Sequence, residues 1–276
     1  MSDHEDYQGI IDQTITIIML CRNQARHLLT AAGSVLENDR VELILVNPGS
    51  SDGTERITKV LIENFPDRVR LISQIDSGPA EGLNNALQIA SGDIISILNG
   101  DDIYLPGTID FVKSQFEKDK GSNILFCAGY LHFEKSGISK YIFPSKLSLY
   151  KLALTGGVTF FHQGVFFKRR DFGHLRYNPD NNVNWDFEHM VEVFKLNPIA
   201  IYSPRPVAVF RIHPISITGS GSHRESLALN MQRISREILG RQLNNFELFF
   251  IWILRIEKFL KSIVLVNVIH LKRTRL

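Results

Sequence analysis

The chain has 276 residues, and 44% of them are hydrophobic, which suits one large globular domain or two small ones. The 31 Lys and Arg residues nearly balance the 29 Asp and Glu residues, so no bulk positive field favours nucleic acid as a partner. Cys21 and Cys127 lie far apart in apolar segments, which indicates reduced core thiols and excludes a disulfide framework.

The first half of the sequence alternates between short apolar runs and amphipathic segments. The runs are rich in β-branched residues and predict buried strands at 15–20, 41–47, 68–73 and 93–99. The segments between and after them predict helices at 25–38, 50–65, 80–91 and 107–119. This alternation predicts right-handed βαβ units, and therefore an α/β fold with a mostly parallel central sheet flanked by helices. Asp52, three residues before Glu55, predicts a capping box at the second helix.

After residue 122 the pattern changes. A hairpin is expected within 123–143, with its turn at Ser136-Gly137, and a strand within 159–170. Helices are expected at 145–154, 184–196 and 224–240. Two further strands, 200–203 and 207–213, are expected on either side of a break at Pro204-Arg205-Pro206. We expect residues 1–222 to form one domain and residues 223–276 a C-terminal helical extension.

Three polar residues, Asn47, Asp76 and Asp101, each follow a predicted strand. Parallel strands end at one edge of the sheet, and ligands bind there. Asp101 is followed directly by Asp102, and two adjacent carboxylates in an apolar setting repel each other and lose hydration. Either both side chains extend into water as part of an ordinary loop, or a cation lies between them. Neither a G-x-G-x-x-G motif nor a P-loop follows any of the strands.

Several segments occur in an order typical of one enzyme family. They are "MLCRNQARHLLTAAGSVLEN", "NPGSSDGT", "SQIDSGPAEGLNNALQIASGDIISILNGDD", "FFHQGVFFKRRDF", "NWDFEHMVEVF" and "FRIHPISIT". In this order they resemble the inverting nucleotide-sugar glycosyltransferases of family 2, which have the GT-A fold. The resemblance extends from about Thr14 to Ser216. It implies transfer of a sugar from a nucleoside diphosphate to a hydroxyl of a glycan or lipid-linked acceptor, in surface polysaccharide synthesis.

The resemblance also implies a bound Mn²⁺ or Mg²⁺ ion. Asp101 stands where the family's main metal ligand lies, Asp102 next to it, and Asn99 where the first Asp of a D-x-D motif often is. His213 stands where related enzymes carry a His that contacts metal or phosphate. Such an ion stabilises the negative charge that develops on the leaving diphosphate, and it needs only one or two protein carboxylates. A lone His such as His213 is as often a satisfied core or surface residue.

Further positions are assigned by the same resemblance. Donor contacts fall on Arg22, Asn47, Asp76, Glu81, Asn84 and Asn99, and acceptor-side contacts on His162 and Gln163. Two of these depart from the family pattern. Asn47 replaces the carboxylate that usually contacts the nucleobase, and Arg22 replaces an aromatic residue that packs on it. An amide oxygen still accepts from a base N–H, and a guanidinium still stacks on a base.

The expected general base is the most marked departure. Inversion requires a base that deprotonates the acceptor hydroxyl. The family position for it holds Asn184, which cannot act as a base. We therefore assign the catalytic role to Asp186, although two residues along a helix rotate a side chain by about 200°. The simpler role for Asp186 and Glu188 is a favourable interaction with the helix N-terminus.

The C-terminal segment 245–276 is apolar apart from one face that carries Glu247, Lys258, Lys261 and Lys272. Arg255 and Glu257 interrupt it, so it is not expected to span a membrane, and Lys272, Arg273 and Arg275 make a basic cluster. It is expected either to pack on the enzyme or a second copy as a homodimer, or to lie on an anionic membrane surface. The acidic first residues do not form a secretory signal. The expected place is the cytoplasm, including the inner face of the cell membrane.

Two other hypotheses stay open at the level of the sequence. Asn47 and Asn184 also fit a GT-A-fold binding or assembly subunit that holds nucleotide and metal but has lost the base. A sugar-phosphate nucleotidyltransferase has a similar sheet. It should carry a Gly-rich basic loop near the N-terminus, which "MLCRNQ" is not.

Overall fold

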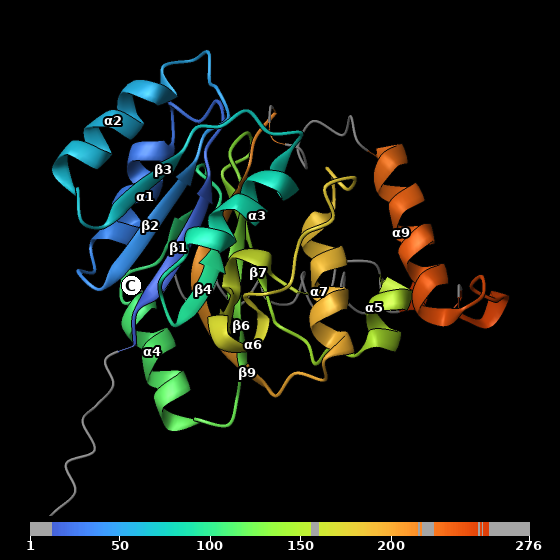
Figure 1. The fold of residues 1–276 in the computed structure, drawn as a ribbon. Coiled ribbons are helices and arrows are strands. Elements are labelled where there is room, and N and C mark those ends of the chain that lie inside the picture. The colour runs from blue at the N-terminus through green and yellow to red at the C-terminus, as the bar shows by residue number, and fades with distance from the viewer. Residues whose placement is uncertain are drawn as a thin grey trace, which may run out of the picture.

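A nine-stranded sheet runs through the centre of the molecule, and helices pack on both of its faces (Figure 1). The strand order is β3-β2-β1-β4-β8-β6-β9-β5, and β7 pairs with β6. The structure is a computed structural model, and it describes residues 13–155, 160–214, 216, 224–247, 249 and 251–253.

The first four strands form the parallel part of the sheet. They are β1 (Ile15–Leu20), β2 (Val41–Val46), β3 (Val69–Ile72) and β4 (Ile94–Ile97). The helices that connect them are α1 (Leu28–Leu36), α2 (Thr54–Asn64) and α3 (Pro79–Ile89). These strands, and helices α1 and α2, lie within the segments predicted for them, and α3 begins one residue before its predicted segment. Strands buried on both faces have continuous apolar sequences that are easily recognised.

The second part of the sheet adds antiparallel pairs. Its strands are β5 (Ile103–Tyr104), β6 (Ile124–Phe133), β7 (Ile138–Ile142), β8 (Val165–Lys168) and β9 (Ala200–Ile212). β8 runs antiparallel to both β4 and β6, whereas β9 runs parallel to β6 and antiparallel to β5. The sheet is therefore mixed: parallel on the β3 side, with antiparallel pairs beyond β4.

The predicted break at Pro204-Arg205-Pro206 does not divide the chain into two strands. β9 continues through it, and its register against β6 shifts on both sides of Ala128. Proline has no backbone N–H to donate to a neighbouring strand. The extra residues of β9 therefore form a bulge that is not paired with β6. The Arg205 side chain lies over the ring of Phe111, which fixes the bulge to α4 (Thr108–Lys118).

Two apolar cores form on the two faces of the sheet. One lies under α1, α2 and α4, and the other under α3 and the later helices. These later helices are α5 (Leu149–Thr155), α6 (Arg169–Phe172), α7 (Trp185–Lys195) and α9 (Arg224–Leu239), with a short 3₁₀ turn, η1 (His162–Gly164). The core on this second face therefore joins both halves of the sequence.

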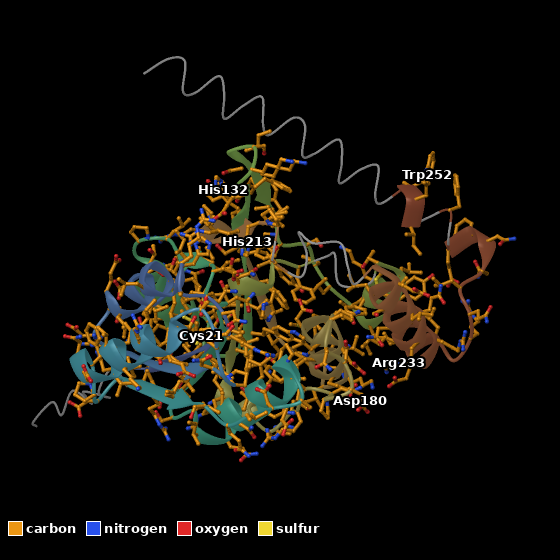
Figure 2. The ribbon with its side chains drawn as sticks, turned by 90° about the horizontal axis from the view of Figure 1, so that it is seen from above. Cys21, His132, Asp180, His213, Arg233 and Trp252 are labelled. Carbon is orange, nitrogen blue, oxygen red and sulfur yellow. The ribbon has the colours of Figure 1, made fainter. Side chains whose placement is uncertain are left out.

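Helix α9 packs directly on the rest of the fold, far from β1–β3 (Figures 1 and 2). Its Ile234 is buried in the second core, and the Ser235 hydroxyl donates to the carbonyl of Ala153 in α5 at 2.6 Å. The expected domain boundary at residue 222 falls outside the described residues, and so does the extension after residue 253. In the described part of the chain, no helix has the length and apolar character required to cross a bilayer.

Gly92 provides a test of how tightly the sheet is packed. It lies between α3 and β4, where a Cβ atom would come within 2.5 Å of the Thr16 backbone nitrogen in β1. We expect Gly92→Ala to lower the free energy of unfolding by about 2 kcal/mol, measured by urea denaturation.

Gly33 is the matched control, because it is an exposed glycine inside α1 with no atom within 4 Å of an added Cβ. Gly33→Ala should raise the free energy of unfolding by about 0.5 to 1 kcal/mol. If both substitutions changed the free energy of unfolding by the same amount, the tight packing of Gly92 against β1 would be contradicted.

Candidate functional site

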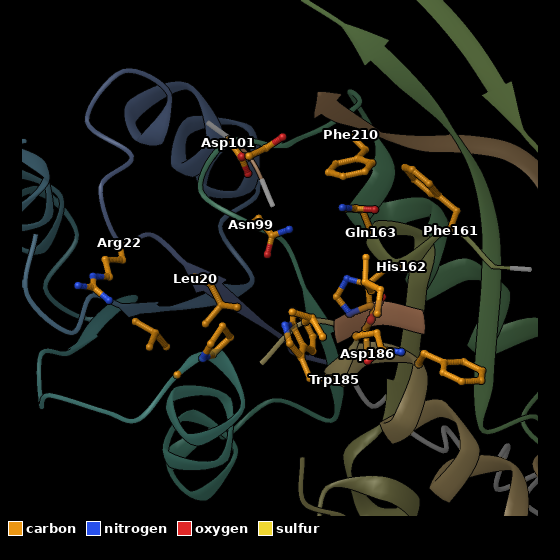
Figure 3. A pocket seen from close by; sticks show the side chains of 18 of the residues that line it. Leu20, Arg22, Asn99, Asp101, Phe161, His162, Gln163, Trp185, Asp186 and Phe210 are labelled. Atoms are coloured by element: carbon orange, nitrogen blue, oxygen red, sulfur yellow. The ribbon is translucent and has the colours of Figure 1, made fainter. Parts of the chain in front are cut away.

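A cavity of about 700 Å³ opens where the parallel strands end. Its walls come from the segments after β1, β2 and β4, and from η1, α7 and β9 (Figure 3). The predicted site residues that line it are Arg22, Asp76, Asn99, Asp101, His162, Gln163 and Asp186. Of the three residues expected together at the strand ends, Asp76 and Asp101 line the cavity and Asn47 does not.

Asp101 and His213 form a buried pair at this cavity. The carboxylate Oδ2 of Asp101 lies 2.9 Å from Nε2 of His213, and both side chains are almost fully buried. Asp101 lines the cavity wall, and His213 lies behind it, at the end of β9. One carboxylate and one imidazole thus converge from segments 112 residues apart in sequence.

Asp102 faces the interior of the protein instead. Its Oδ1 accepts from the backbone N–H of Arg211 at 2.9 Å, and its Oδ2 accepts from the amides of Gln163 at 2.8 Å and Asn99 at 3.3 Å. Burial, and then the charge of Asp101, raise the pKa of Asp102 well above its ordinary value. Both of its oxygens are engaged, so Asp102 supports the turn and does not itself reach the cavity.

The donor atoms at this edge suit a divalent ion that shares its ligands with a substrate. Asp101 supplies a carboxylate and Asn99 an amide side chain on the cavity wall, and His213 supplies an imidazole in contact with Asp101. Among the described residues there is no group of three or more His, Cys, Asp and Glu side chains that would enclose an ion. Mg²⁺ and Mn²⁺ commonly keep several positions for water and phosphate oxygens, so two protein ligands fit such an ion.

A second layer of polar contacts was not foreseen from the sequence. Arg211 Nη1 donates to the Asp101 carbonyl at 3.0 Å and lies 3.3 Å from Nδ1 of His27. The His27 ring lies next to that of His213, with centroids 5.4 Å apart, and its Nε2 lies 3.5 Å from a Glu134 carboxylate oxygen. His27 and Arg211 are 184 residues apart, and no local pattern connects them. Together they fix the backbone and the imidazole at the Asp101 site.

Arg22 and Asp76 also lie on the cavity wall. Arg22 is exposed, so its guanidinium is free to approach a bound group. Burial raises the pKa of Asp76, the neighbouring Glu81 adds to this, and the charge of Arg22 opposes it. These two residues add a cation and a carboxyl group to the polar part of the wall.

Three residues predicted to contact a donor lie outside the cavity wall. Asn47 is buried and its side-chain oxygen accepts from the Ser50 hydroxyl at 2.5 Å. Glu81 accepts from the backbone N–H and the hydroxyl of Ser77, and Asn84 exchanges two hydrogen bonds of 2.8 Å with the Tyr177 backbone. In this structure they shape the loops around the cavity, and their contact with a donor stays a prediction.

The capping box predicted at Asp52 and Glu55 does not form. The residue before α2 is Gly53, whose φ of 96° lies in the left-handed region, and no side chain caps the helix. Asp52 instead accepts from the backbone N–H groups of Ala25 and Thr54 at 2.9 and 3.0 Å. It thereby ties the loop after β1 to the loop after β2 at the cavity edge.

The start of α7 forms another part of the cavity wall. Asn184 precedes the helix, 7% exposed, and its Oδ1 has no hydrogen-bond partner in the described part of the chain. His162 and Asp186 lie together on the cavity wall, and the His162 ring meets the Trp185 ring edge-on with centroids 5.0 Å apart (Figure 3). Burial lowers the pKa of His162, and the charge of Asp186 opposes this.

Of the two carboxylates at the start of α7, only Asp186 lines the cavity. Glu188 accepts from the amides of Asn178 and Asn181 at 3.0 and 2.7 Å and pairs with Arg233 of α9 at 2.8 Å. It connects α7 to α9 and is not directed at a substrate. Gln163 lines the cavity too, although its amide is committed to Asp102.

The family model for "Glycosyl transferase family 2" matches residues 16–175, more than half of the chain. The chain belongs to glycosyl transferase family 2. The match covers the strands and loops that carry Arg22, Asp76, Asp101 and His162. It confirms the resemblance seen in the sequence and favours glycosyl transfer over the nucleotidyltransferase alternative.

This glycosyltransferase is similar to several curated bacterial proteins. It is 32% identical over 127 residues to the putative glycosyltransferase EpsE of Bacillus subtilis, covering 45% of each chain. It is 30% identical over 152 residues to the Escherichia coli protein WfgD, covering 53% of this chain and 58% of that one. WfgD is named a UDP-Glc:alpha-D-GlcNAc-diphosphoundecaprenol beta-1,3-glucosyltransferase. The matched region spans less than two thirds of the length of these relatives.

Solved structures confirm the GT-A architecture of this family 2 glycosyltransferase. The S. aureus TarS fragment in complex with UDP-GlcNAc has a TM-score of 0.64 at 15% identity, covering 84% of this chain and 68% of that one. The mannosyltransferase PcManGT from Pyrobaculum calidifontis, in complex with GDP-Man and Mn²⁺, has a TM-score of 0.61 at 18% identity, covering 87% and 68%. Because both sequence identities are below 25%, the similarity to these two structures shows a shared fold and nothing more.

His189, a buried residue of α7, gives a prediction about how the stability of the protein depends on pH. Burial, and then the charge of His162, lower the pKa of His189 to about 3, and its ring stacks on that of Tyr177. The unfolded chain takes up this proton near pH 6.5, so stability is complete above that pH and is lost as the pH falls toward 3. We expect His189 to account for a loss of about 2 kcal/mol in the free energy of unfolding between pH 7 and pH 5.

The measurement is urea denaturation at both pH values. His189→Met should remove this part of the pH dependence, whatever its effect on absolute stability. His174→Gln, at an exposed position, should leave the dependence as it is in the wild type. An unchanged dependence in the His189 variant would show that other groups cause it.

Proposed function

We propose that this enzyme transfers a sugar from a nucleoside-diphosphate sugar to a hydroxyl of a glycan or lipid-linked acceptor, with inversion and with Mn²⁺ or Mg²⁺. The observation that carries the proposal is a single cavity with Asp101 on one wall and Asp186 on another. The similar proteins support a nucleotide-sugar donor and a lipid-linked acceptor. WfgD is named for UDP-Glc and a lipid diphosphate, and TarS and PcManGT were solved with nucleotide sugars.

The donor diphosphate would lie next to Asp101 and His213. These residues would hold the ion, which neutralises the charge that grows on the leaving diphosphate. Arg211 and His27 keep the Asp101 backbone and the His213 ring in place. Arg22, exposed on the cavity wall, would stack on the base or bind it by hydrogen bonds.

The acceptor hydroxyl would approach from the start of α7. Asp186 takes up the proton as the hydroxyl oxygen attacks the sugar carbon opposite the leaving phosphate. Asn184 cannot take a proton, but its unpartnered oxygen can accept a hydrogen bond from a sugar hydroxyl. Phe160, Phe161 and Trp185 line the same part of the cavity and would exclude water from the reacting atoms.

The proposed place of this reaction is the cytoplasm, at the inner face of the cell membrane, and the proposed pathway is surface polysaccharide synthesis. Two observations support the proposal. Cys21 and Cys127 are free and buried, as expected for a protein in a reducing compartment. The name of WfgD refers to a lipid-linked acceptor, which lies in a membrane.

Asn184 also favours a second candidate function. A protein that kept the donor site but lacked a working base would bind nucleotide and metal without turnover, as a binding or assembly subunit. The two candidates differ only in the role of Asp186, so one set of variants separates them.

The test combines binding and turnover. UDP-glucose, UDP-GlcNAc and GDP-mannose are screened with Mn²⁺ by thermal shift, and release of the nucleoside diphosphate is measured for each. Asp101→Asn should abolish the Mn²⁺-dependent shift, because it removes the charged ligand. Asp186→Asn should keep the shift and slow release by about 10²-fold or more.

Asp67→Asn is the control, because Asp67 is exposed and precedes β3, at the opposite end of that strand. It should match the wild type in both measurements. A shift without release in the wild type would favour the binding subunit. The absence of any Mn²⁺-dependent shift with all three nucleotides would contradict both candidates.

A further inference from the structure

Four large apolar side chains near residue 250 lie in water. Phe246, Phe249, Trp252 and Ile253 are 75%, 56%, 58% and 40% exposed, and each has helical backbone, as have all the described residues among 245–253. Their spacing of three and four residues puts them on one side of that helix, and the rings of Phe249 and Trp252 stack with centroids 6.0 Å apart. We call these four side chains the aromatic face.

The helix that carries the aromatic face is fixed at its start by a capping box. The backbone N–H of Asn244 donates to Glu247, and the N–H of Glu247 donates to the Asn244 side chain, both at 2.9 Å. Arg241 donates two hydrogen bonds to the Glu247 carboxylate, at 2.7 and 2.8 Å, and Tyr150 of α5 donates a third at 3.2 Å. These contacts connect the start of the helix to the body of the protein.

Glu247 therefore lies on the inner side of the helix. It is only 2% exposed, although the helical periodicity of the sequence groups it with three lysines, at 258, 261 and 272. The four apolar side chains are left on the outer side, and Trp252 lies at the margin of the molecule, remote from the sheet (Figure 2). Single exposed apolar residues are ordinary, but a grouped set on the side of the helix away from the buried Glu247 carboxylate marks a contact surface.

The chemistry of this surface favours lipid over protein. Trp and Phe are the residues that enter the headgroup region of a bilayer. From residue 248 onward the sequence has six Lys and Arg residues and one Glu, a positive excess that complements anionic lipid. A stable dimer takes about 20 to 30 residues on each side, and the aromatic face offers four.

We propose that the aromatic face inserts into the headgroup region of an anionic bilayer and anchors the enzyme there. The capping box and the Glu247–Arg241 pair set the angle at which the helix leaves the protein. The proposal deepens the proposed function, because it names the surface that would bring the cavity to a lipid-linked acceptor. Its test measures lipid binding alone, so the result does not depend on whether the protein transfers a sugar.

The experiment is co-sedimentation of the full chain with vesicles. One set contains phosphatidylcholine and phosphatidylglycerol, and the other phosphatidylcholine alone. We expect binding to the mixed vesicles that weakens at high salt. The double variant Phe249→Ser/Trp252→Ser should bind at least about tenfold more weakly. Leu229→Ser, which removes an equally exposed apolar side chain of α9, should bind like the wild type.

Fluorescence provides a second measurement. The chain has two Trp residues, Trp185 in the cavity wall and Trp252, so the Trp185→Phe variant reports on Trp252 alone. Its emission should move to shorter wavelength with the mixed vesicles. Equal binding by the double variant, or no binding by the wild type, would overturn the proposal. A concentration-dependent dimer without lipid, lost in the double variant, would assign the face to a second copy instead.

Discussion

The site depends on a buried carboxylate, Asp102, which has hydrogen-bond donors on both oxygens. The backbone of Arg211 in β9, the amide of Gln163 in η1 and the amide of Asn99 after β4 all converge on it. A carboxylate without these donors would be very costly to bury. Because Asp102 is held inward, the adjacent Asp101 is turned to the cavity, where it meets His213. The two neighbouring carboxyl groups thus have separate places, one buried in a structural network and one on the cavity wall.

The parallel part of the fold could be predicted from the sequence, and the later part only in outline. β1 to β4 have continuous apolar sequences, and each is followed by an amphipathic helix, so local patterns determine them. The order of β8, β6 and β9 depends on pairing between residues far apart in sequence, which no local pattern encodes. The prolines at 204 and 206 pointed to a break, but the sheet accommodates them as a bulge because the flanking pairs with β6 continue.

The candidate site could be predicted where a polar residue lies in the loop that follows a strand. Asp101 comes directly after β4, and its place in the topology alone brings it to the cavity. The contacts of His27 and Arg211 were not predictable, because 184 residues separate them and each is unremarkable in its own segment. Asn84 exchanges hydrogen bonds with the Tyr177 backbone, which the family pattern did not indicate, and its contact with a donor stays a prediction. A motif gives the residue type at a position, and the fold decides what it contacts.

The proposed function requires Asp101 and His213 to hold a divalent ion together with a nucleoside diphosphate. A crystal structure of the wild-type protein with UDP and Mn²⁺ tests it most directly, by the anomalous signal of manganese. The account predicts one manganese site at about 2.1 Å from the Asp101 carboxylate and the His213 imidazole, with diphosphate oxygens as further ligands. Manganese bound elsewhere, or UDP bound with the Asp101–His213 pair of 2.9 Å intact and no metal between them and the diphosphate, would contradict it.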